Sequence, residues 1–342
     1  MLKKIFNYIK KFILEEYKFI MAMISIFIIL NIPLNYYIIV GGGISGASSR
    51  INVENKYKSK GSFNISYVTQ LNGNVLTYVL SYIIPSWERE NSDNYKYDVN
   101  EDIKDIKFRS ELDLKTANGD ATYWAYTLAN KKIKETSRHL YIIATYKEDY
   151  ETPLEVQDEI ISIDDKTYDS VNKYSEYLQT KKTKDIVKVK VIRNKKEKIL
   201  NSKIYDNKGF KLLGVTLQYV KEYETTPKLD IKFKHSESGP SGGLITTLEI
   251  YNQLTKSDLT KGKTIAGTGT IEPDGTIGQI GGIEHKLLGA HHAKADIFLC
   301  PAGKNYTDAK KYIKKKNIKI KLIKVTNIKD TINELKRCKK EG

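Results

Sequence analysis

The feature that most constrains this chain is a long apolar run near its start. From Phe19 to Val40 the sequence "FIMAMISIFIILNIPLNYYIIV" contains no charged residue. At about 1.5 Å per residue, a helix of this length crosses a hydrocarbon core of about 30 Å once. Residues 19–40 are therefore predicted to form a transmembrane anchor. A cleaved signal peptide is the alternative, because two asparagines and a proline weaken the second half of the run.

The charges around this run predict its orientation. Lysines precede it, at positions 3, 4, 10, 11 and 18. By the positive-inside tendency, residues 1–18 are expected in the cytoplasm and residues 41–342 outside the cell membrane. The basic N-terminus is also expected to contact anionic membrane lipids. The predicted localisation is thus a single-pass cell-membrane protein whose main part is extracytoplasmic.

Length and charge exclude some classes of protein. With 342 residues the chain is long enough for two domains of ordinary size. Its formal net charge of +16 comes from lysines in every segment, and no nucleic-acid recognition motif accompanies them, so no nucleic-acid partner is expected.

The two cysteines, Cys300 and Cys338, form neither a disulfide framework nor a metal-ligand spacing. Neither a metal nor another cofactor is expected.

The segment after the apolar run carries no recognisable chemistry. Residues 41–136 are predicted to form a juxtamembrane linker followed by a mixed α/β segment. "GGGISGASSR" (41–50) has the composition of a flexible linker. An alternating strand is expected at 61–71, a helix at 74–90 that stops near a proline, and a charged helix within 98–134.

A strand, a strand pair, a helix and a hairpin follow in residues 137–206. This order resembles a PDZ domain, a module that binds an extended peptide as an added strand at a sheet edge. The resemblance implies that the binding edge includes "LYII", which is Leu140, Tyr141, Ile142 and Ile143. Gln157 departs from the glycine that is usual there in bacterial PDZ domains. A small β-domain that serves only as a spacer is the alternative.

In "HSESGPSGGLITTLEIYNQL" (235–254) a serine stands where a helix should begin. Apolar residues recur at helical spacing after it, so a helix over residues 241–254 is predicted with one apolar and one polar face. Ser241 would then lie in the first turn, where unpaired N–H groups and the helix dipole stabilise an oxyanion. Gly239, Gly242 and Gly243 leave room for a substrate backbone. A serine that simply begins a helix is the alternative.

A lysine that could act as a base follows in "GGIEHKLLGAHHAKADIFLCP" (281–301). On a helical wheel, Lys286 falls beside the buried stripe of a helix that begins near Ile283. Partial burial disfavours its ammonium form and lowers its pKa, so the neutral amine could act as a general base. A lysine that extends its charge from the edge of an apolar face to solvent is the alternative.

These motifs together resemble the Lon-type serine–lysine peptidases. The matching stretches are "GPSGG", "AGTGTIEPDGTIGQIGGIEHK" and "ADIFLCP", in the family's order within the predicted domain 207–342. The resemblance implies that Ser241 is the nucleophile, Lys286 the base, and Thr268 the residue that orients the lysine; a plain strand threonine is the alternative for Thr268. Gly242 and Ser238 depart from the family's usual residues, and Ser238 puts the local hydrogen bonding in question.

Four of the five histidines are weaker candidates for chemistry. The wheel predicts that His285 and His292 face solvent and that His291 lies nearer the buried side, without a ligand set around it. A mechanism through His235, which is close to Ser241 in sequence, is the chemical alternative.

The expected fold class is an α+β multidomain protein: an N-terminal transmembrane helix, a PDZ-like β-rich domain and a C-terminal Lon-type α/β proteolytic domain. The expected function is an ATP-independent, membrane-anchored endopeptidase that cleaves peptides or unfolded protein segments, since no G-x-x-x-x-G-K-[ST] motif occurs in the sequence. The resemblance also implies a homo-oligomer. Two other classes stay open: a catalytically inert PDZ adaptor, and a scaffold at a membrane or nucleic-acid surface.

Overall fold

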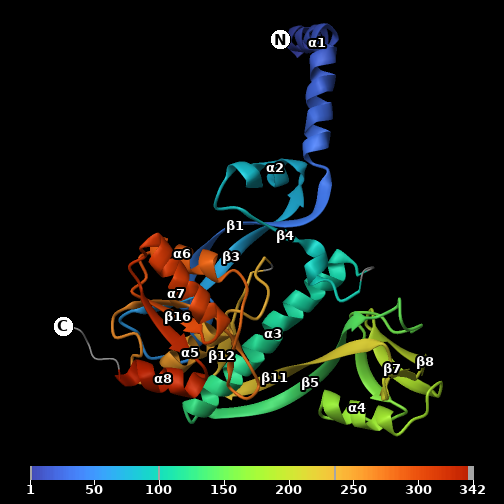
Figure 1. The fold of residues 1–342 in the computed structure, drawn as a ribbon, viewed down its shortest axis with the longest axis vertical. Coiled ribbons are helices and arrows are strands. Elements are labelled where there is room, and N and C mark those ends of the chain that lie inside the picture. The colour runs from blue at the N-terminus through green and yellow to red at the C-terminus, as the bar shows by residue number, and fades with distance from the viewer. Residues whose placement is uncertain (1, 99–100, 235, 338–342) are drawn as a thin grey trace. The chain divides into compact units, whose positions relative to one another are not determined.

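The computed structural model describes residues 2–98, 101–234 and 236–337. The chain divides into two compact units, one formed by residues 1–41 and 68–95 and the other by residues 42–67 and 96–342. Figure 1 shows the elements of both. Strands β1 (Pro33–Gly46) and β3 (Ser62–Asn74) contribute residues to each unit.

The first unit begins with helix α1 (Leu2–Leu30). The first part of β1 then pairs antiparallel with β4 (Glu88–Asn91), with Tyr36 opposite Asn91 and Ile39 opposite Glu88. Between them lies helix α2 (Val75–Ile83), which begins because the Asn74 side chain accepts a hydrogen bond from the Thr77 amide in a capping box. A short 3-10 helix, η2 (Ser92–Tyr95), follows β4.

The predicted transmembrane helix over 19–40 is wrong. Helix α1 ends at Leu30, and the apolar run continues as β1 because Pro33 cannot continue the helix. From Phe19 to Leu30 the helical part is about 18 Å long, against about 30 Å of hydrocarbon. In the described part of the chain, no helix combines the length and the apolar character needed to cross a membrane. The predicted localisation as a single-pass membrane protein is therefore also wrong.

The predicted PDZ-like region is a five-stranded antiparallel sheet in the order β11-β5-β6-β7-β8. The strands are β5 (Lys132–Thr145), β6 (Glu159–Ile163), β7 (Ile186–Arg193), β8 (Lys196–Lys203) and β11 (Val215–Thr226). Helix α4 (Val171–Gln179) begins where the Ser170 side chain accepts a hydrogen bond from the Lys173 amide. A small ribbon of β9 (Tyr205–Asn207) and β10 (Phe210–Leu212) precedes β11.

The predicted peptide-binding edge at Leu140, Tyr141, Ile142 and Ile143 is not a free edge. These residues lie in β5, which pairs with β11 on one side and with β6 on the other. The sheet gains β11 from a segment that the sequence pattern assigned to the next domain, so β5 is an interior strand. The edge strand on this side of the sheet is β11, and β8 is the edge strand on the other side.

The C-terminal part of the second unit is a sheet whose strands run in the order β17-β16-β13-β3-β1, and β17, β16, β13 and β3 are parallel to one another. Its later strands are β13 (Thr264–Gly267), β16 (Ile297–Pro301) and β17 (Lys321–Val325). Helices α5 (Gly243–Leu254) and α8 (Ile328–Arg337) share one apolar core with the sheet. Helices α6 (Ile283–His292) and α7 (Lys304–Lys316) contribute to the core on the other face.

Two short pairs complete this part. Strand β2 (Ile51–Val53), after the 3-10 helix η1 (Ala47–Ser49), pairs with β12 (Leu229–Ile231). The predicted hairpin around Asp274-Gly275 is confirmed: β14 (Thr270–Ile271) pairs antiparallel with β15 (Ile277–Gly278).

Helix α5 is buried on all sides, so the predicted polar face does not contact solvent. Helix α3 (Ile103–Leu128) packs against it, and Ala121, Ala125 and Tyr126 share its core. The amide of Gln253 is satisfied inside the protein: its nitrogen donates to the Ile51 carbonyl and its oxygen accepts from the Val53 amide. The polar face of α5 is thus a set of internal hydrogen bonds.

The predicted flexible linker at 41–50 is also wrong, because Gly41–Gly46 belongs to β1. A Cβ at Gly42 would stand 2.3 Å from the His285 carbonyl oxygen of α6, and a Cβ at Gly289 of α6 would stand 2.5 Å from the Gly42 backbone. Glycines are needed here because two backbones approach closely. The run that resembles a linker is a docking surface for α6.

Candidate active site

Ser241 lies in the turn immediately before helix α5, which begins at Gly243 rather than at the predicted Ser241. Two hydrogen bonds join this turn to the segment after β13: the Gly269 amide donates to the Ser241 carbonyl (2.8 Å), and the Leu244 amide donates to the Gly269 carbonyl (3.0 Å). On the other side, the Gly239 amide donates to the Ser110 carbonyl of α3 (2.9 Å). The position of Ser241 is therefore fixed by two neighbouring elements.

The chain before the serine is also anchored. Glu237 forms an ion pair with Arg50 and accepts a hydrogen bond from the Lys234 amide (2.9 Å). Ser238 is exposed to solvent. Although Ser238 differs from the residue usual in the family, the position of Ser241 is set by the backbone hydrogen bonds described above.

Helix α6 brings Lys286 to the serine. The helix begins after Gly282, whose φ of 67° lies in the left-handed region that glycine tolerates. The Lys286 Nζ lies 2.9 Å from Ser241 Oγ and 3.1 Å from Thr268 Oγ1. Thr268 Oγ1 also donates to the Ser241 carbonyl (3.1 Å). The structure thus brings together the three side chains that the sequence singled out.

The environment of Lys286 favours its neutral form. The residue is only 3% exposed and Thr268 is fully buried. Burial lowers the pKa of the Lys286 amine to about 8, and no charged neighbour contributes to this shift. About a tenth of the amine is then neutral at pH 7. A hydroxyl within hydrogen-bond distance of such an amine can be deprotonated, as in other serine–base pairs.

The three glycines of the turn differ in what they can contribute. The Gly243 amide donates to the Pro240 carbonyl (3.1 Å) and the Gly239 amide to Ser110, so these two predicted oxyanion donors are already engaged. A Cβ at Gly243 would also meet Ile271 at 2.7 Å, which gives this glycine a packing role. The amide of Gly242 has no hydrogen-bond partner in the described part of the chain. Space is open on the Cβ side of Gly239.

The histidines lie as follows. His292 is exposed and His291 half-buried, as predicted, but His285 is buried, so its predicted solvent exposure is wrong. The helical wheel treated α6 as a surface helix, whereas β1 covers the side on which His285 lies. His235 lies outside the described residues.

Sequence reasoning missed the residues that support this site from a distance. Ser110 of α3 contributes only a backbone carbonyl, which leaves no signal in its side chain. The pair Gly42 and Gly289 is visible as two glycines, but their contact joins positions far apart in the chain. The glycine run near the start of the chain was the one available signal.

Comparisons with known proteins agree with both resemblances. Residues 234–337 match the Lon protease (S16) C-terminal proteolytic domain, and residues 141–204 match a PDZ domain. Among solved structures, the PDZ domain of an SdrC-like protein from Listeria monocytogenes is similar, at 27% identity over 25% of this chain and 92% of that chain, with a TM-score of 0.22.

A PDZ domain of an SdrC-like protein from Listeria innocua is similar at 25% identity over 23% of this chain and 92% of that chain, with a TM-score of 0.21. No curated protein matches the chain. Taken with the geometry of the site, the two domain matches identify the chain as one that joins a PDZ domain to a Lon protease (S16) proteolytic domain.

Proposed function

We propose that this protein is a serine endopeptidase in which Ser241 is the nucleophile and Lys286 is the general base. The observation that carries the proposal is the 2.9 Å separation between Lys286 Nζ and Ser241 Oγ in a buried site. Burial without a carboxylate partner keeps a fraction of the amine neutral, which is the form that a base needs. The Lon-type proteolytic domain supports the same reaction class.

In the proposed acylation step, the Ser241 hydroxyl gives its proton to Lys286 while Oγ forms a bond to the scissile carbonyl carbon. The Gly242 amide at the start of α5 is the proposed donor to the oxyanion. Collapse of the intermediate breaks the C–N bond, and the Lys286 ammonium protonates the leaving amine. Water then gives a proton to Lys286, attacks the acyl ester and releases Ser241 with its proton.

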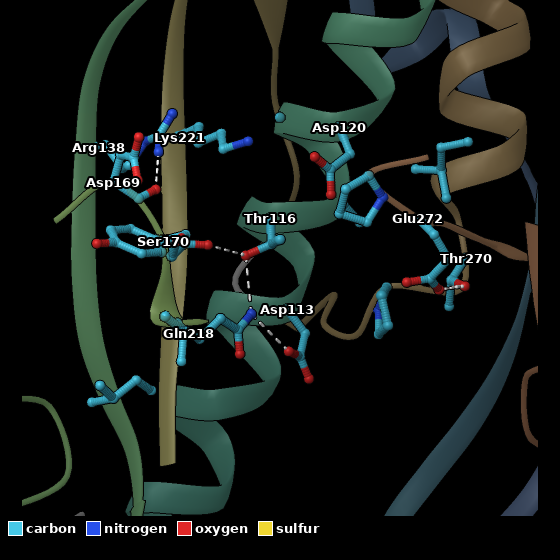
Figure 2. A pocket seen from close by; sticks show the side chains of 18 residues that line it. Asp113, Thr116, Asp120, Arg138, Asp169, Ser170, Gln218, Lys221, Thr270 and Glu272 are labelled. Atoms are coloured by element: carbon cyan, nitrogen blue, oxygen red, sulfur yellow. Dashed lines mark hydrogen bonds between the residues drawn. The ribbon is translucent and has the colours of Figure 1, made fainter. Parts of the chain in front are cut away.

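The proposed substrate cleft is a cavity of about 510 Å³ in the second unit. Its lining includes Leu217–Tyr219 of the edge strand β11, part of α3, and Pro240 beside the nucleophile. Figure 2 shows Asp113 and Asp120 on the side of α3 that faces Thr270 and Glu272. An extended peptide added at β11 would reach the turn that carries Ser241, which suits flexible or unfolded substrates.

Cleavage is proposed to need no ATP, because these residues contain no phosphate-binding loop of the G-x-x-x-x-G-K-[ST] type. Self-association is proposed from the family resemblance alone. Sedimentation of the full chain at several concentrations tests it.

Cleavage of an unfolded protein by the full chain, without ATP, tests the proposal. Ser241→Ala and Lys286→Ala are each expected to lower kcat by at least about 1000-fold. The matched controls are Ser257→Ala and Lys310→Ala, which change exposed residues of the same types. Undiminished cleavage by both active-site variants would overturn the mechanism. A wild-type chain that binds the substrate without cleaving it would indicate the adaptor alternative.

A further inference from the structure

One buried side chain near the site has no hydrogen-bond partner. Ser66 of β3 is 1% exposed, and its Oγ makes no hydrogen bond within the described part of the chain. A buried hydroxyl without a partner is costly, so such groups call for an explanation. Packing alone gives none, because an alanine would occupy this position without that cost.

Strand register places Ser66 beside Thr268. Strands β3 and β13 are parallel neighbours with Ile65 opposite Gly267, the last residue of β13, so the positions that follow are Ser66 in β3 and Thr268 just after β13. Neighbouring strands lie about 4.8 Å apart. The Ser66 backbone therefore lies one strand away from the residue that contacts the Lys286 amine.

The alternation of side chains places Ser66 on the face that carries Lys286. Ile65 lies on the α5 side, where it is 3.2 Å from the position of a Cβ at Gly242. Ser66 therefore points to the opposite face, which is covered by α6. Ala266 shares one apolar cluster on that same face with Leu287, the neighbour of Lys286.

The lysine has one hydrogen more than its known partners accept. As an ammonium, Lys286 carries three N–H donors. Ser241 Oγ and Thr268 Oγ1 can accept two of them. No charged group contributes to the shift of its pKa, which leaves the third donor without a carboxylate.

We propose that one water molecule accepts the third hydrogen bond of the Lys286 ammonium and donates a hydrogen bond to Ser66 Oγ, and so positions the amine after it has taken the proton of Ser241. Ser66 is then a positioning residue for the reaction, and this role rests on the proposed function. This water molecule gives a partner both to the unpartnered hydroxyl and to the remaining N–H.

The proposal predicts two changes in the pH–rate profile when the Ser66 hydroxyl is removed. An acceptor favours the charged amine, so its removal lowers the pKa of Lys286 and moves the rising limb of the pH–rate profile to lower pH. Because the ammonium that forms during acylation loses a partner, kcat on the plateau falls by about tenfold or more. A purely structural role would lower stability without moving the limb.

The test compares Ser66→Ala with Ser202→Ala in the full chain. Ser202 is a second fully buried hydroxyl without a hydrogen-bond partner among the described residues, but it lies on β8 of the PDZ domain. Ser66→Ala is expected to lower kcat and shift the limb, and Ser202→Ala to do neither. A Ser66→Ala variant with the wild-type limb and plateau would overturn the proposal.

A second pair of variants guards against misfolding. Ser66→Thr keeps the hydroxyl, whereas Ser66→Val has nearly the same shape without it. The valine variant should show the lower kcat and the shifted limb, and the threonine variant should show neither. Identical profiles for the two variants would contradict the role of the hydroxyl.

A readout without substrate separates this inference from the proposed function. The pH dependence of acetylation of Lys286, followed by mass spectrometry, reports the pKa of the amine directly. Ser66→Ala should lower that pKa even if no substrate is cleaved. An unchanged pKa in an enzyme that loses cleavage on Ser241→Ala would refute the role of Ser66 and leave the peptidase proposal intact.

Discussion

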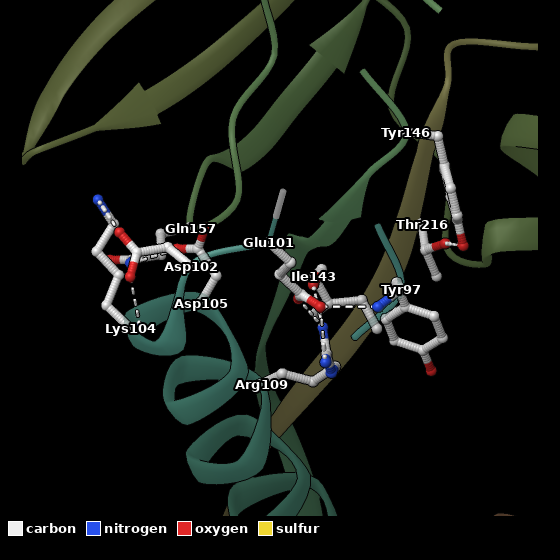
Figure 3. A network of polar contacts seen from close by, with 10 residues as sticks. All are labelled: Tyr97, Glu101, Asp102, Lys104, Asp105, Arg109, Ile143, Tyr146, Gln157 and Thr216. Carbon is white, nitrogen blue, oxygen red and sulfur yellow. Dashed lines mark hydrogen bonds and ion pairs between the residues drawn. The ribbon is translucent and has the colours of Figure 1, made fainter. Parts of the chain in front are cut away.

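Two regions of the second unit bury a cation in opposite ways. Near the PDZ domain, the guanidinium of Arg109 forms an ion pair with Glu101 and donates to the Ile143 carbonyl (3.2 Å), as Figure 3 shows. Their side chains are 9% and 4% exposed. Lys286 in the proteolytic domain is buried as deeply, yet it contacts hydroxyls rather than a carboxylate.

The difference indicates which buried cation stabilises the fold and which is suited to proton transfer. A buried ion pair holds both groups in their charged forms, because each stabilises the other in a medium of low dielectric constant. An amine with only hydroxyl partners loses hydration without gaining an opposite charge, so its pKa falls to about 8. What would make Lys286 a usable base in the proposed mechanism is thus the missing carboxylate, among the described residues, as much as the nearby serine.

The largest effect is expected when a carboxylate is placed beside the lysine. Thr268→Asp should pair with Lys286, raise the pKa of the amine and keep it protonated, so kcat at pH 7 should fall by about 1000-fold or more. Thr268→Ser keeps the hydroxyl and should retain most of the activity. Cleavage of an unfolded protein measures both. Substantial activity in Thr268→Asp would show that the charge state of Lys286 does not limit the reaction.

The converse change removes the paired cation itself. Arg109→Met leaves Glu101 buried and unpaired, which should lower the free energy of unfolding by about 3 kcal/mol or more. Urea unfolding measures this, and Lys107→Met on the same helix is the control, because its ion pair with Glu111 is exposed and worth less than about 1 kcal/mol. Equal effects of the two variants would mean that burial does not distinguish the pairs.

Stability should depend on pH through Lys286. Its pKa is lowered in the folded state from 10.5 to about 8, so the unfolded state binds more protons between these values. The free energy of unfolding should therefore rise with pH across this window, by about 3 kcal/mol in total. Urea unfolding at several pH values should show the rise in the wild type and not in Lys286→Met. A rise that persists in the variant would have another origin.

A smaller effect should follow from loosening the helix that carries Lys286. Gly42→Ala places a Cβ 2.3 Å from the His285 carbonyl oxygen, so α6 must shift, at a cost of about 1–3 kcal/mol. Cleavage should fall because the lysine moves relative to Ser241. Gly46→Ala is the matched control, since its Cβ would have no neighbour closer than 3.9 Å. Equal activities of the two variants would show that β1 does not position the base.

Local signals were enough to predict which side chains meet but not what surrounds them. Ser241, Lys286 and Thr268 stand in short motifs, and the structure brings these three side chains together. The apolar run from Phe19 ends as a strand because of Pro33 and because that strand pairs with residues far along the chain. The glycines at 41–46 have a linker's composition, and only their contact with α6 reveals their use.

The same limit applies to the PDZ domain. Its strand order was readable from alternation and turns, but the edge of its sheet was not. Strand β11 lies beyond the stretch that resembled the domain, and it covers the side of β5 at Leu140–Ile143 that was expected to bind peptide. Which strand is outermost is decided by a distant segment, so the local pattern could not indicate it.

The pH dependence of kcat/KM for cleavage of an unfolded protein by the full chain tests the central claim most directly. Because the neutral amine of Lys286 is the proposed base, kcat/KM should rise with pH along a limb whose apparent pKa is near 8. Lys286→Ala should remove the activity together with the limb. A rising limb that persists with the same apparent pKa in Lys286→Ala would contradict the assignment of this lysine as the base.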